Sequence, residues 1–501
     1  MGIGTIALGP GIVHTYFTEI LPRSLVGEVL DPYSSQSNSM AALFHKLFIY
    51  EPQLNPAPAS NSPLLYSIFY PVWQAAVLAP LFIFVDAEER GGDREQLHWA
   101  AWVFALLLLS PVPASYHFVV MALSVVLLAD FLWKRGEMRL IGVALLLYTM
   151  MSLVELLPRR FASGNVALAF SRLWIAIGFW LLLLFCLWRD RMKGRVWWSR
   201  PRLGLICVAV LIFWAVEALG NYRHFAHLGA ETQRRVLPMP PAYLSTGLRK
   251  TSRGYVFVAM GAQRYEVLDQ AGRSIGREED ELSAAATEGS PVVLVETATR
   301  GGSQLIVTPL DGGSGQTIPL MQDAESPAFS PDGMTLAFIR EVRGRGSVWI
   351  VSLQSPLGPP SGTPVRITDA GYDVRNFALA PSGRIVFAAK LGDRTSLFQW
   401  MPGGSPREFL PDLVDVDSPA VSPNEQLIAF TRRVRNRWQL EYVNSQTGAK
   451  QTLTNGDCNA YGPEWMDAQQ LTYATDCGRG LGLTALASVL IGETPTPVNK
   501  R

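Results

Sequence analysis

The sequence predicts a multi-domain protein, in which a polytopic α-helical membrane domain of about six transmembrane helices precedes an all-β propeller of about six blades. Two observations predict this fold class. Charge-poor apolar segments recur as far as Tyr222, and short alternating segments separated by turn signals follow from about Tyr243. We therefore assign residues 1–222 to the membrane domain, 223–242 to a linker and 243–501 to the propeller.

The balance of charge argues against one class of partner. The 501 residues include 43 Lys and Arg against 42 Asp and Glu, a net charge of +1. Nucleic-acid-binding proteins normally gather an excess of basic residues on one face. We therefore expect no nucleic-acid partner.

Six apolar segments are the candidates for membrane helices: 63–85, 97–110, 116–133, 140–157, 173–188 and 203–220. Each approaches the length that crosses about 30 Å of hydrocarbon, except the second, which is short. Residues 1–13 are also apolar, but they are too short to span and lack the features of a signal peptide. We interpret them as part of a helix that begins upstream.

Basic residues in the short loops predict the orientation. One side carries Arg90, Arg94, Lys134, Arg135, Arg139, Arg189, Arg191, Lys193, Arg195, Arg200 and Arg202, and the other mainly Arg159, Arg160 and Arg172. The richer side is expected to be cytoplasmic. Six crossings then place both the segment before residue 63 and the propeller outside, on the periplasmic side of a bacterial cell (inner) membrane. The lipid bilayer is the first expected partner.

An outer loop, residues 14–62, is rich in polar and aromatic residues. Its centre, MAALFHKLFIY, follows a Ser/Asn-rich start that could cap a helix and could lie on the membrane or under other loops. The Pro-rich run SPVPASYHF cannot continue a regular helix and should place Tyr116 and His117 beside this loop. Such a turn either lines a site or simply connects two spans.

Two acidic residues lie near the outer ends of the predicted membrane helices. Their position needs an explanation, because placing a charge in hydrocarbon costs free energy. Glu155 lies one turn before Arg159, so an internal ion pair is the plainer interpretation. Glu217 could simply reach the interface. Neither residue alone indicates catalysis.

The motifs HTYFTEILPR, DPYSSQSNSMAALFHKLF and LLLLSPVPASYHFVV, together with the basic inner loops, resemble the C-terminal part of glycosyltransferase family 87. The resemblance covers roughly residues 12–222. It implies a GT-C-type membrane enzyme that uses polyprenyl-phosphate-linked sugars, chiefly mannose, and no other cofactor. Where the family commonly reads Asn-Gln-Ser-Leu, the run from Gln36 to Ser39 keeps the polar character but not the whole pattern.

The resemblance departs from the family at the beginning of the chain. GT-C enzymes generally carry an essential acidic residue in the first outer loop, and this chain is expected to begin after that loop. Glu19 and Asp31 lie in a later loop, so neither inherits the catalytic role, and the catalytic residue is unknown. The candidates for sugar or phosphate contact are Gln36, Asn38, Tyr116, His117, Arg159 and Arg160. The two arginines could equally be interface anchors.

The β-rich half contains an internal repeat. The strings SPAFSPDGMTLAFIR, NFALAPSGRIVFAAK, SPAVSPNEQLIAFTR and GPEWMDAQQLTYATD begin at Ser326, Asn376, Ser418 and Gly462, at spacings of roughly 42 to 50 residues. Each is followed by a second hairpin, and four strands in such a repeat form a propeller blade. With two weaker units upstream, the count is about six. The repeats resemble the TolB-type propeller, in which SPDG occupies a turn between strands.

A propeller scaffold does not specify a chemistry. The sequence shows no His/Asp/Glu cluster at metal-binding spacing and no Gly-x-Ser-x-Gly nucleophile motif. Asp332 of the SPDG run is interpreted as a turn residue. We therefore expect the propeller to bind a protein, glycan or peptide.

Of the four cysteines, Cys186 and Cys207 lie in apolar segments, whereas Cys458 and Cys477 lie in one predicted blade. The second pair is placed to form a disulfide in an oxidising compartment. Two free, buried thiols are the alternative.

These observations leave two functional hypotheses. The first is a GT-C-type transferase that moves a hexose from a polyprenyl-phosphate donor on the extracytoplasmic face, with the propeller binding the acceptor or a partner. On this hypothesis the present chain is expected to be the C-terminal portion of the enzyme. The alternative is a membrane-anchored propeller without catalytic activity, serving as a sensor or assembly module.

Overall fold

The chain forms two compact units. The computed structural model describes residues 10–25, 27–28, 30–84, 93–111, 113, 115–154, 166–193, 200–237, 239–240, 242, 244–260, 264–275, 280–299, 302–311, 316–356, 358–392, 394–434, 436–454, 456, 458–480 and 482–492. The helical unit comprises Met1–Glu51, Asn55–Ala230 and Gly478–Leu481. The β unit comprises Pro52–Leu54, Glu231–Cys477 and Gly482–Arg501.

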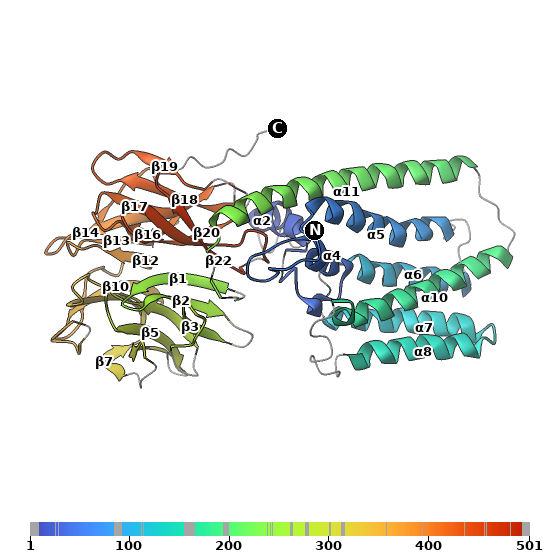
Figure 1. The fold of residues 1–501 in the computed structure, drawn as a ribbon, viewed down its shortest axis with the longest axis horizontal. Helices are drawn as coiled ribbons and strands as arrows, with labels where there is room; N and C mark the ends of the chain where they lie inside the picture. The colour runs from blue at the N-terminus through green and yellow to red at the C-terminus, as the bar shows by residue number, and fades with distance from the viewer. Residues whose placement is uncertain are drawn as a thin grey trace. The chain divides into compact units, whose positions relative to one another are not determined.

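The helical unit begins with short helices and continues with long ones (Figure 1). The short elements are α2 (Pro10–Thr15), the π-helix η1 (Tyr16–Ile20), α3 (Leu21–Leu25), the 3₁₀ helix η2 (Ser35–Ser37) and α4 (Met40–Phe48). The elements that follow are α5 (Pro63–Phe84), α6 (Asp93–Leu109), η3 (Ser115–Val119), α7 (Val120–Trp133), α8 (Met138–Leu153), α9 (Val166–Ala169), α10 (Ser171–Lys193) and α11 (Arg200–Arg235).

Each of the six apolar segments expected from the sequence overlaps one of the long helices. Three stretches of the described residues are long and apolar enough to cross a membrane: Pro63–Phe84, Ser171–Asp190 and Gly204–Ala226. The apolar helices His117–Trp133 and Met138–Leu153 are shorter. Helix α6 begins with the polar run DREQ, which shortens its apolar part. The unit is therefore compatible with membrane association.

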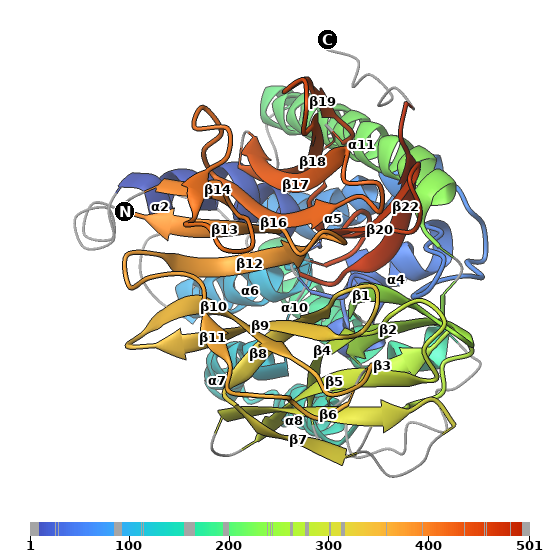
Figure 2. The same cartoon turned by 90° about the vertical axis from the view of Figure 1, so that its left-hand side faces the viewer.

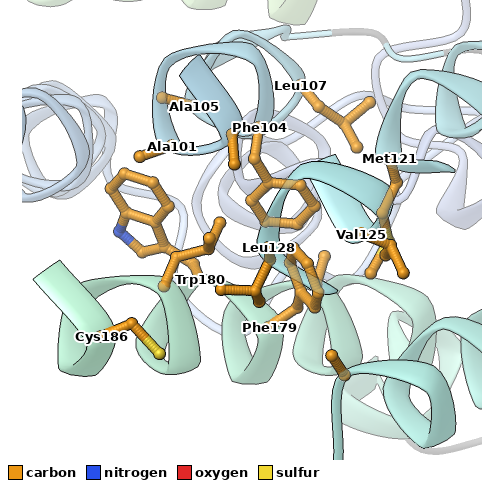
Figure 3. Close-up of a cluster of buried hydrophobic side chains, with 14 of the residues drawn as sticks. Ala101, Phe104, Ala105, Leu107, Met121, Val125, Leu128, Phe179, Trp180 and Cys186 are labelled. Carbon is orange, nitrogen blue, oxygen red and sulfur yellow. The ribbon is translucent and has the colours of Figure 1, made fainter. Parts of the chain in front are cut away.

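Helices α6, α7, α8 and α10 share one apolar core (Figure 3). The Phe104 ring on α6 lies 4.8 Å from that of Phe179 on α10, centroid to centroid. Met121 and Leu128 on α7 are fully buried in the same cluster. This close packing fixes the helices that carry the loops of the candidate site.

Ion pairs join the ends of the same helices. The buried carboxylate of Asp190 lies 2.8 Å from Arg94 and 2.5 Å from Arg135, joining α10 to the ends of α6 and α7. Arg189 pairs with Glu137. The structure thus gathers at one end of the bundle several charged residues that the sequence analysis assigned to a common side.

The β unit contains six consecutive antiparallel sheets of three or four strands, counted over the described residues (Figure 2). The first three are β1 (Leu244–Thr251), β2 (Gly254–Met260) and β3 (Tyr265–Asp269); β4 (Glu281–Ala285), β5 (Val292–Thr299), β6 (Gly302–Pro309) and β7 (Gln316–Gln322); and β8 (Ala324–Phe329), β9 (Thr335–Val342), β10 (Arg345–Ser352) and β11 (Val365–Arg366).

The next three sheets repeat this pattern. They are β12 (Asp373–Leu379), β13 (Ile385–Leu391), β14 (Arg394–Trp400) and β15 (Arg407–Glu408); β16 (Val416–Val421), β17 (Leu427–Val434), β18 (Arg437–Asn444) and β19 (Lys450–Thr452); and β20 (Ala460–Trp465), β21 (Gln470–Thr475) and β22 (Ala485–Leu490). The number of sheets agrees with the number of repeats expected from the sequence.

The repeated strings have a common backbone geometry. Ser326, Ser418 and Gly462 occupy equivalent positions and all have positive φ, at 50°, 48° and 51°. Each lies at a register shift between the first and second strands of its sheet. A bulge of this kind leaves backbone groups out of the ladder, so it accommodates the proline that follows in all three strings.

The SPDG run forms a tight turn, as predicted. Asp332 Oδ1 accepts hydrogen bonds from Ser330 Oγ at 2.6 Å and from Met334 N at 3.0 Å. In the fifth sheet, Asn424 Oδ1 accepts from Ser422 Oγ at 2.7 Å and from Gln426 N at 3.2 Å. Asp332 is therefore explained by turn geometry.

The first and last sheets of the β unit are joined. Val236 forms an antiparallel bridge with Ala487, and Leu237 N donates to Leu486 O at 2.8 Å. Ser245 N, in β1, also donates to Thr484 O at 2.8 Å. Two parts of the predicted linker are therefore ordered. Helix α11 continues through residue 235, and the next two residues pair with β22; the compact units divide between Ala230 and Glu231.

The predicted disulfide is confirmed. Cys458 and Cys477 are bonded, with their Cα atoms 5.1 Å apart. Asn459 and Asp476 beside them are hydrogen-bonded twice, each at 2.8 Å. Cys186 is free and buried, and Cys207 is free and exposed.

Candidate functional site

The loop that precedes α4 contacts the Pro-rich turn after α6. Ser39 caps α4 by accepting a hydrogen bond from Ala42 N at 3.0 Å, and its hydroxyl donates to Pro111 O at 2.5 Å. Asn38, just before this cap, adopts the left-handed conformation with φ 46°. The structure thus brings the SQSNS run to the SPVP turn, next to which the sequence placed Tyr116 and His117.

The structure describes the side chains of only some of the residues predicted to contact substrate. Gln36 is exposed in η2, and its carbonyl accepts the side-chain amide of Asn38 at 3.3 Å. His117 is half-buried in η3, whereas the side chain of Tyr116 lies outside the described residues. Arg159 and Arg160 also lie outside them. Substrate contact by these residues stays a prediction.

Helix α4 is buried within the helical unit. Met40, Ala42 and Leu43 pack against Phe170 and Leu173 at the beginning of α10. The sequence left open whether this helix lies on the membrane surface or under other loops, and the structure shows it packed against the beginning of α10. The packed helix holds His45 rigidly inside the unit.

The most pronounced feature of this region is a group of titratable side chains, all buried except the half-buried Asp31, and we name this group the loop cluster. Its members are Glu28, Asp31, Tyr33, His45, Glu51 and Arg479. Tyr33 lies within electrostatic reach of the cluster's three carboxylates and of Arg479. Its backbone N–H donates to Asp31 Oδ1 at 2.9 Å, and its hydroxyl donates to Gly478 O at 3.0 Å.

Two of the three carboxylates pair with buried or half-buried bases. Glu28 Oε1 lies 2.8 Å from His224 Nε2 on α11. Glu51 Oε1 lies 3.8 Å from Arg479 Nε, with both side chains at most 1% exposed. A buried charge requires a partner of this kind, because removal from water is costly.

Asp31 is in a different environment from the other carboxylates. It is half-buried and accepts a backbone hydrogen bond from Tyr33. Burial raises the pKa of Asp31 above its usual value, against the opposing effects of Tyr33 N–H, Arg479 and Lys46. A carboxyl group with a raised pKa is better suited to accept a proton near neutral pH.

His45 is neutral and fully enclosed. Burial lowers the pKa of His45 to about 4. Its Nδ1 lies 2.9 Å from Ala41 O and must donate to it, which leaves Nε2 as a hydrogen-bond acceptor. Within the described part of the chain Nε2 has no hydrogen-bond partner, although the ring packs edge-on against Tyr66 at 4.7 Å and Phe225 at 5.1 Å.

The loop cluster offers polar groups that can form hydrogen bonds with a ligand. Among the described residues, no group of three or more His, Cys, Asp and Glu side chains could hold a metal ion. The cluster contains a half-buried carboxylate, a neutral imidazole and a phenol. Burial and the nearby carboxylates raise the pKa of this phenol, Tyr33, well above its usual value. These groups can accept and donate hydrogen bonds to hydroxyl groups of a ligand.

Sequence reasoning did not find this cluster. Glu19 and Asp31 were recognised as loop carboxylates and given no role, and Glu28, His45 and Glu51 received no attention. The available signal was the presence of several acidic residues in one loop between apolar segments. Their partners His224 and Arg479 are too distant in sequence for local pattern to pair them.

Comparison with known proteins yields structural neighbours only. No protein-family model and no curated protein matches the chain. Among solved structures, a TolB from Agrobacterium tumefaciens is 16% identical with a TM-score of 0.35, over 40% of this chain and 73% of that one. TolB from Acinetobacter baumannii is 15% identical with a TM-score of 0.36, over 54% and 69%.

An oligogalacturonate lyase from Vibrio parahaemolyticus is 12% identical with a TM-score of 0.36, over 49% of this chain and 77% of that one. The neighbours are therefore TolB-like β-propeller proteins, at low similarity.

Proposed function

We propose that the protein is a membrane glycosyltransferase of the GT-C type that transfers a hexose, mannose by resemblance to glycosyltransferase family 87, from a polyprenyl-phosphate donor. The observation that carries the proposal is the loop cluster. Glu28 and Glu51 offset the cost of their burial by pairing with His224 and Arg479. The half-buried carboxylate of Asp31 and the neutral imidazole of His45 are therefore the groups of the cluster that we assign to chemistry.

The proposed chemistry needs a group that takes the proton of the acceptor hydroxyl, and hydrogen-bond donors that stabilise the leaving phosphate. The resemblance to glycosyltransferase family 87 passes the catalytic role to neither Glu19 nor Asp31. From the structure, we propose Asp31 for the first role, because Glu28 and Glu51 are already paired with His224 and Arg479. His117 and the two arginines of the 155–165 segment remain the proposed donors.

The proposed membrane arrangement follows the charge asymmetry of the loops. Helices α5, α6, α7, α8, α10 and α11 each cross the inner membrane, with the shorter ones reaching the interfaces. The loop cluster and the β unit are then extracytoplasmic, in a compartment that permits the Cys458–Cys477 disulfide.

We further propose that the six sheets of the β unit form a closed propeller that binds the acceptor, a glycan or protein. The pairing of Val236 and Ser245 with the last sheet supports ring closure. In the transferase, such a module would hold the acceptor near the membrane.

The test is transfer of radiolabelled mannose from polyprenyl-phosphate-mannose in membranes that contain the full chain. We expect transfer by the unchanged protein and a loss of at least about 100-fold for Asp31→Asn. The matched control is Glu288→Gln, which changes a carboxylate with a 71% exposed side chain in the β unit. No transfer above that of membranes lacking the protein would refute the proposal.

A second candidate function, a membrane-anchored sensor or assembly module, is favoured by one specific observation. The β unit has hydrophobic cores of its own, and its first and last sheets pair with each other. Such a unit can bind a partner without catalysis elsewhere. Partner binding that persists in Asp31→Asn, in a protein without transfer activity, would favour this function.

A further inference from the structure

Helices α5 and α11 carry polar side chains within the stretches that are apolar enough to span a membrane. On α5, Tyr66, Tyr70 and Gln74 recur every fourth residue and so lie on one face. On α11, Glu217 and Asn221 have the same spacing. We name these five residues the α5–α11 seam.

Several contacts show that these residues are close together. The ring of Tyr66 lies 4.6 Å from Phe225, one turn beyond Asn221, and 5.5 Å from Tyr70. Gln74 and Glu217 both act on Tyr70, and Glu217 also acts electrostatically on Tyr66. The His45 ring, at 4.7 Å from Tyr66, extends the seam to the loop cluster.

The seam contains polar atoms without partners. Tyr66 OH, Gln74 Oε1, Asn221 Nδ2 and His45 Nε2 are all buried, and none has a hydrogen-bond partner among the described residues. In folded proteins the great majority of buried polar side-chain atoms are paired, so four such atoms in one region need an explanation. In a membrane helix, polar groups of this kind characteristically face a substrate path.

We propose that the α5–α11 seam binds the sugar group of a lipid-linked donor, an assignment that rests on the proposed function. Sugar hydroxyls both donate and accept hydrogen bonds. They match the donors on Tyr66 and Asn221 and the acceptors on His45 and Gln74. The seam contains no Lys or Arg, and Glu217 disfavours an anion, so the chemistry selects a neutral sugar and not the phosphate.

The apolar part of the same ligand has a surface beside the seam. Most of the Gly204–Ala226 stretch is not buried within the chain: in its apolar 18-residue window only 6% of the residues are buried. Leu205, Val208, Leu211, Ile212 and Val216 are exposed along it. Gln74 and Glu217 are half-buried, whereas Tyr66 is fully buried. An amphiphile can thus enter from the bilayer at Gln74 and Glu217, with its chain along α11.

The experiment measures binding of radiolabelled polyprenyl-phosphate-mannose to the full, detergent-solubilised chain, with polyprenyl phosphate as the sugar-free competitor. Tyr66→Phe and Asn221→Leu each remove one unpartnered donor and nearly preserve volume. We expect each to weaken binding of the mannose lipid about tenfold, and to leave binding of the sugar-free lipid unchanged. The matched control, Tyr222→Phe on the adjacent exposed position of α11, should bind like the unchanged protein.

The outcomes separate this inference from the proposed function. Seam-dependent binding without transfer would support the site and refute the transferase. Transfer and binding that are unaffected by both substitutions would overturn the seam while leaving the transferase standing. If Tyr66→Phe only raises the melting temperature and leaves mannose-lipid binding intact, Tyr66 OH faces no ligand and the inference is wrong.

Discussion

The β unit and the helical unit position their polar side chains by different routes. In the β unit, Ser330 and Asp332 are two residues apart in one turn, and Ser422 and Asn424 repeat the arrangement in another sheet. In the helical unit, Glu28 reaches a partner 196 residues away, and Tyr33 reaches one 445 residues away. The local contacts of the β unit recur from sheet to sheet. The long-range contacts of the loop cluster do not recur, so the loss of any one cluster residue should lower the free energy of unfolding substantially.

The largest effect should come from breaking the cluster. Glu51→Ala leaves the fully buried Arg479 without its carboxylate, so we expect the free energy of unfolding to fall by about 3–5 kcal/mol. The measurement is denaturant unfolding of the full chain in detergent, followed by circular dichroism. The control, Asp412→Ala, removes an ion pair with Lys450; the Asp412 side chain is 69% exposed, so its loss should lower the free energy of unfolding only slightly. Equal losses of unfolding free energy in Glu51→Ala and in the control would contradict the comparison between the helical unit and the β unit.

Removing the disulfide measures how much one covalent link adds to the stability that local contacts give the β unit. Cys458→Ser opens a link between residues 19 apart, and we expect a loss of about 3 kcal/mol. Urea unfolding followed by tryptophan fluorescence measures this loss. Cys207→Ser changes an exposed, free thiol and serves as the control. Indistinguishable unfolding curves for the two variants would show that neighbouring contacts alone hold the last sheet.

The response to pH distinguishes the buried histidine from the rest of the cluster. The pKa of His45 is about 4 in the folded chain against about 6.5 when unfolded, so the unfolded chain binds more protons between these values. Stability is therefore complete above about pH 6.5 and falls as the pH is lowered, by about 2 kcal/mol at pH 5. His45→Phe should lack this loss.

The raised pKa of Asp31 acts in the opposite sense, because protonation then favours the folded state. This contribution is common to the unchanged protein and to His45→Phe, so it cancels in their difference. Unfolding measured at pH 7 and pH 5 gives the result, and the control is His14→Phe, at an exposed position. The prediction fails if the unchanged protein and His45→Phe lose stability equally.

The smallest effect concerns the repeated turns. Asp332→Ala and Asn424→Ala each remove the acceptor of two hydrogen bonds, and each should cost about 1 kcal/mol. Because the turns belong to different sheets, we expect the double variant to show the sum. A difference of more than about 1 kcal/mol between the single variants would show that the repeats are not energetically equivalent.

Much of the fold could be predicted because its determinants are local. Apolar segments of helical length coincide with α5, α6, α7, α8, α10 and α11, and the SPDG and SPNE runs coincide with turns. The extension of α11 through Arg235 was missed, although residues 223–235 contain no proline that would end a helix. Local pattern identified the elements better than their ends.

The candidate site could be predicted only in part. The contact of Ser39 with Pro111 was expected in outline, because a Ser/Asn-rich cap and a Pro-rich turn were both placed at the same side. The partners of Glu28 and Glu51 could not be found, since nothing near them in sequence indicates His224 or Arg479. The same holds for His45, whose unpartnered nitrogen is a property of its buried surroundings.

The bridge between Val236 and Ala487 also affects biosynthesis. Val236 leaves the ribosome directly after α11, but the strand that it pairs with is among the last to be made. During translation, the edge of the nascent β unit therefore stays unpaired until β22 is made. Exposed strand edges of this kind can pair with other chains. Premature termination before β22 would leave that edge permanently open and make the shortened chain prone to aggregation.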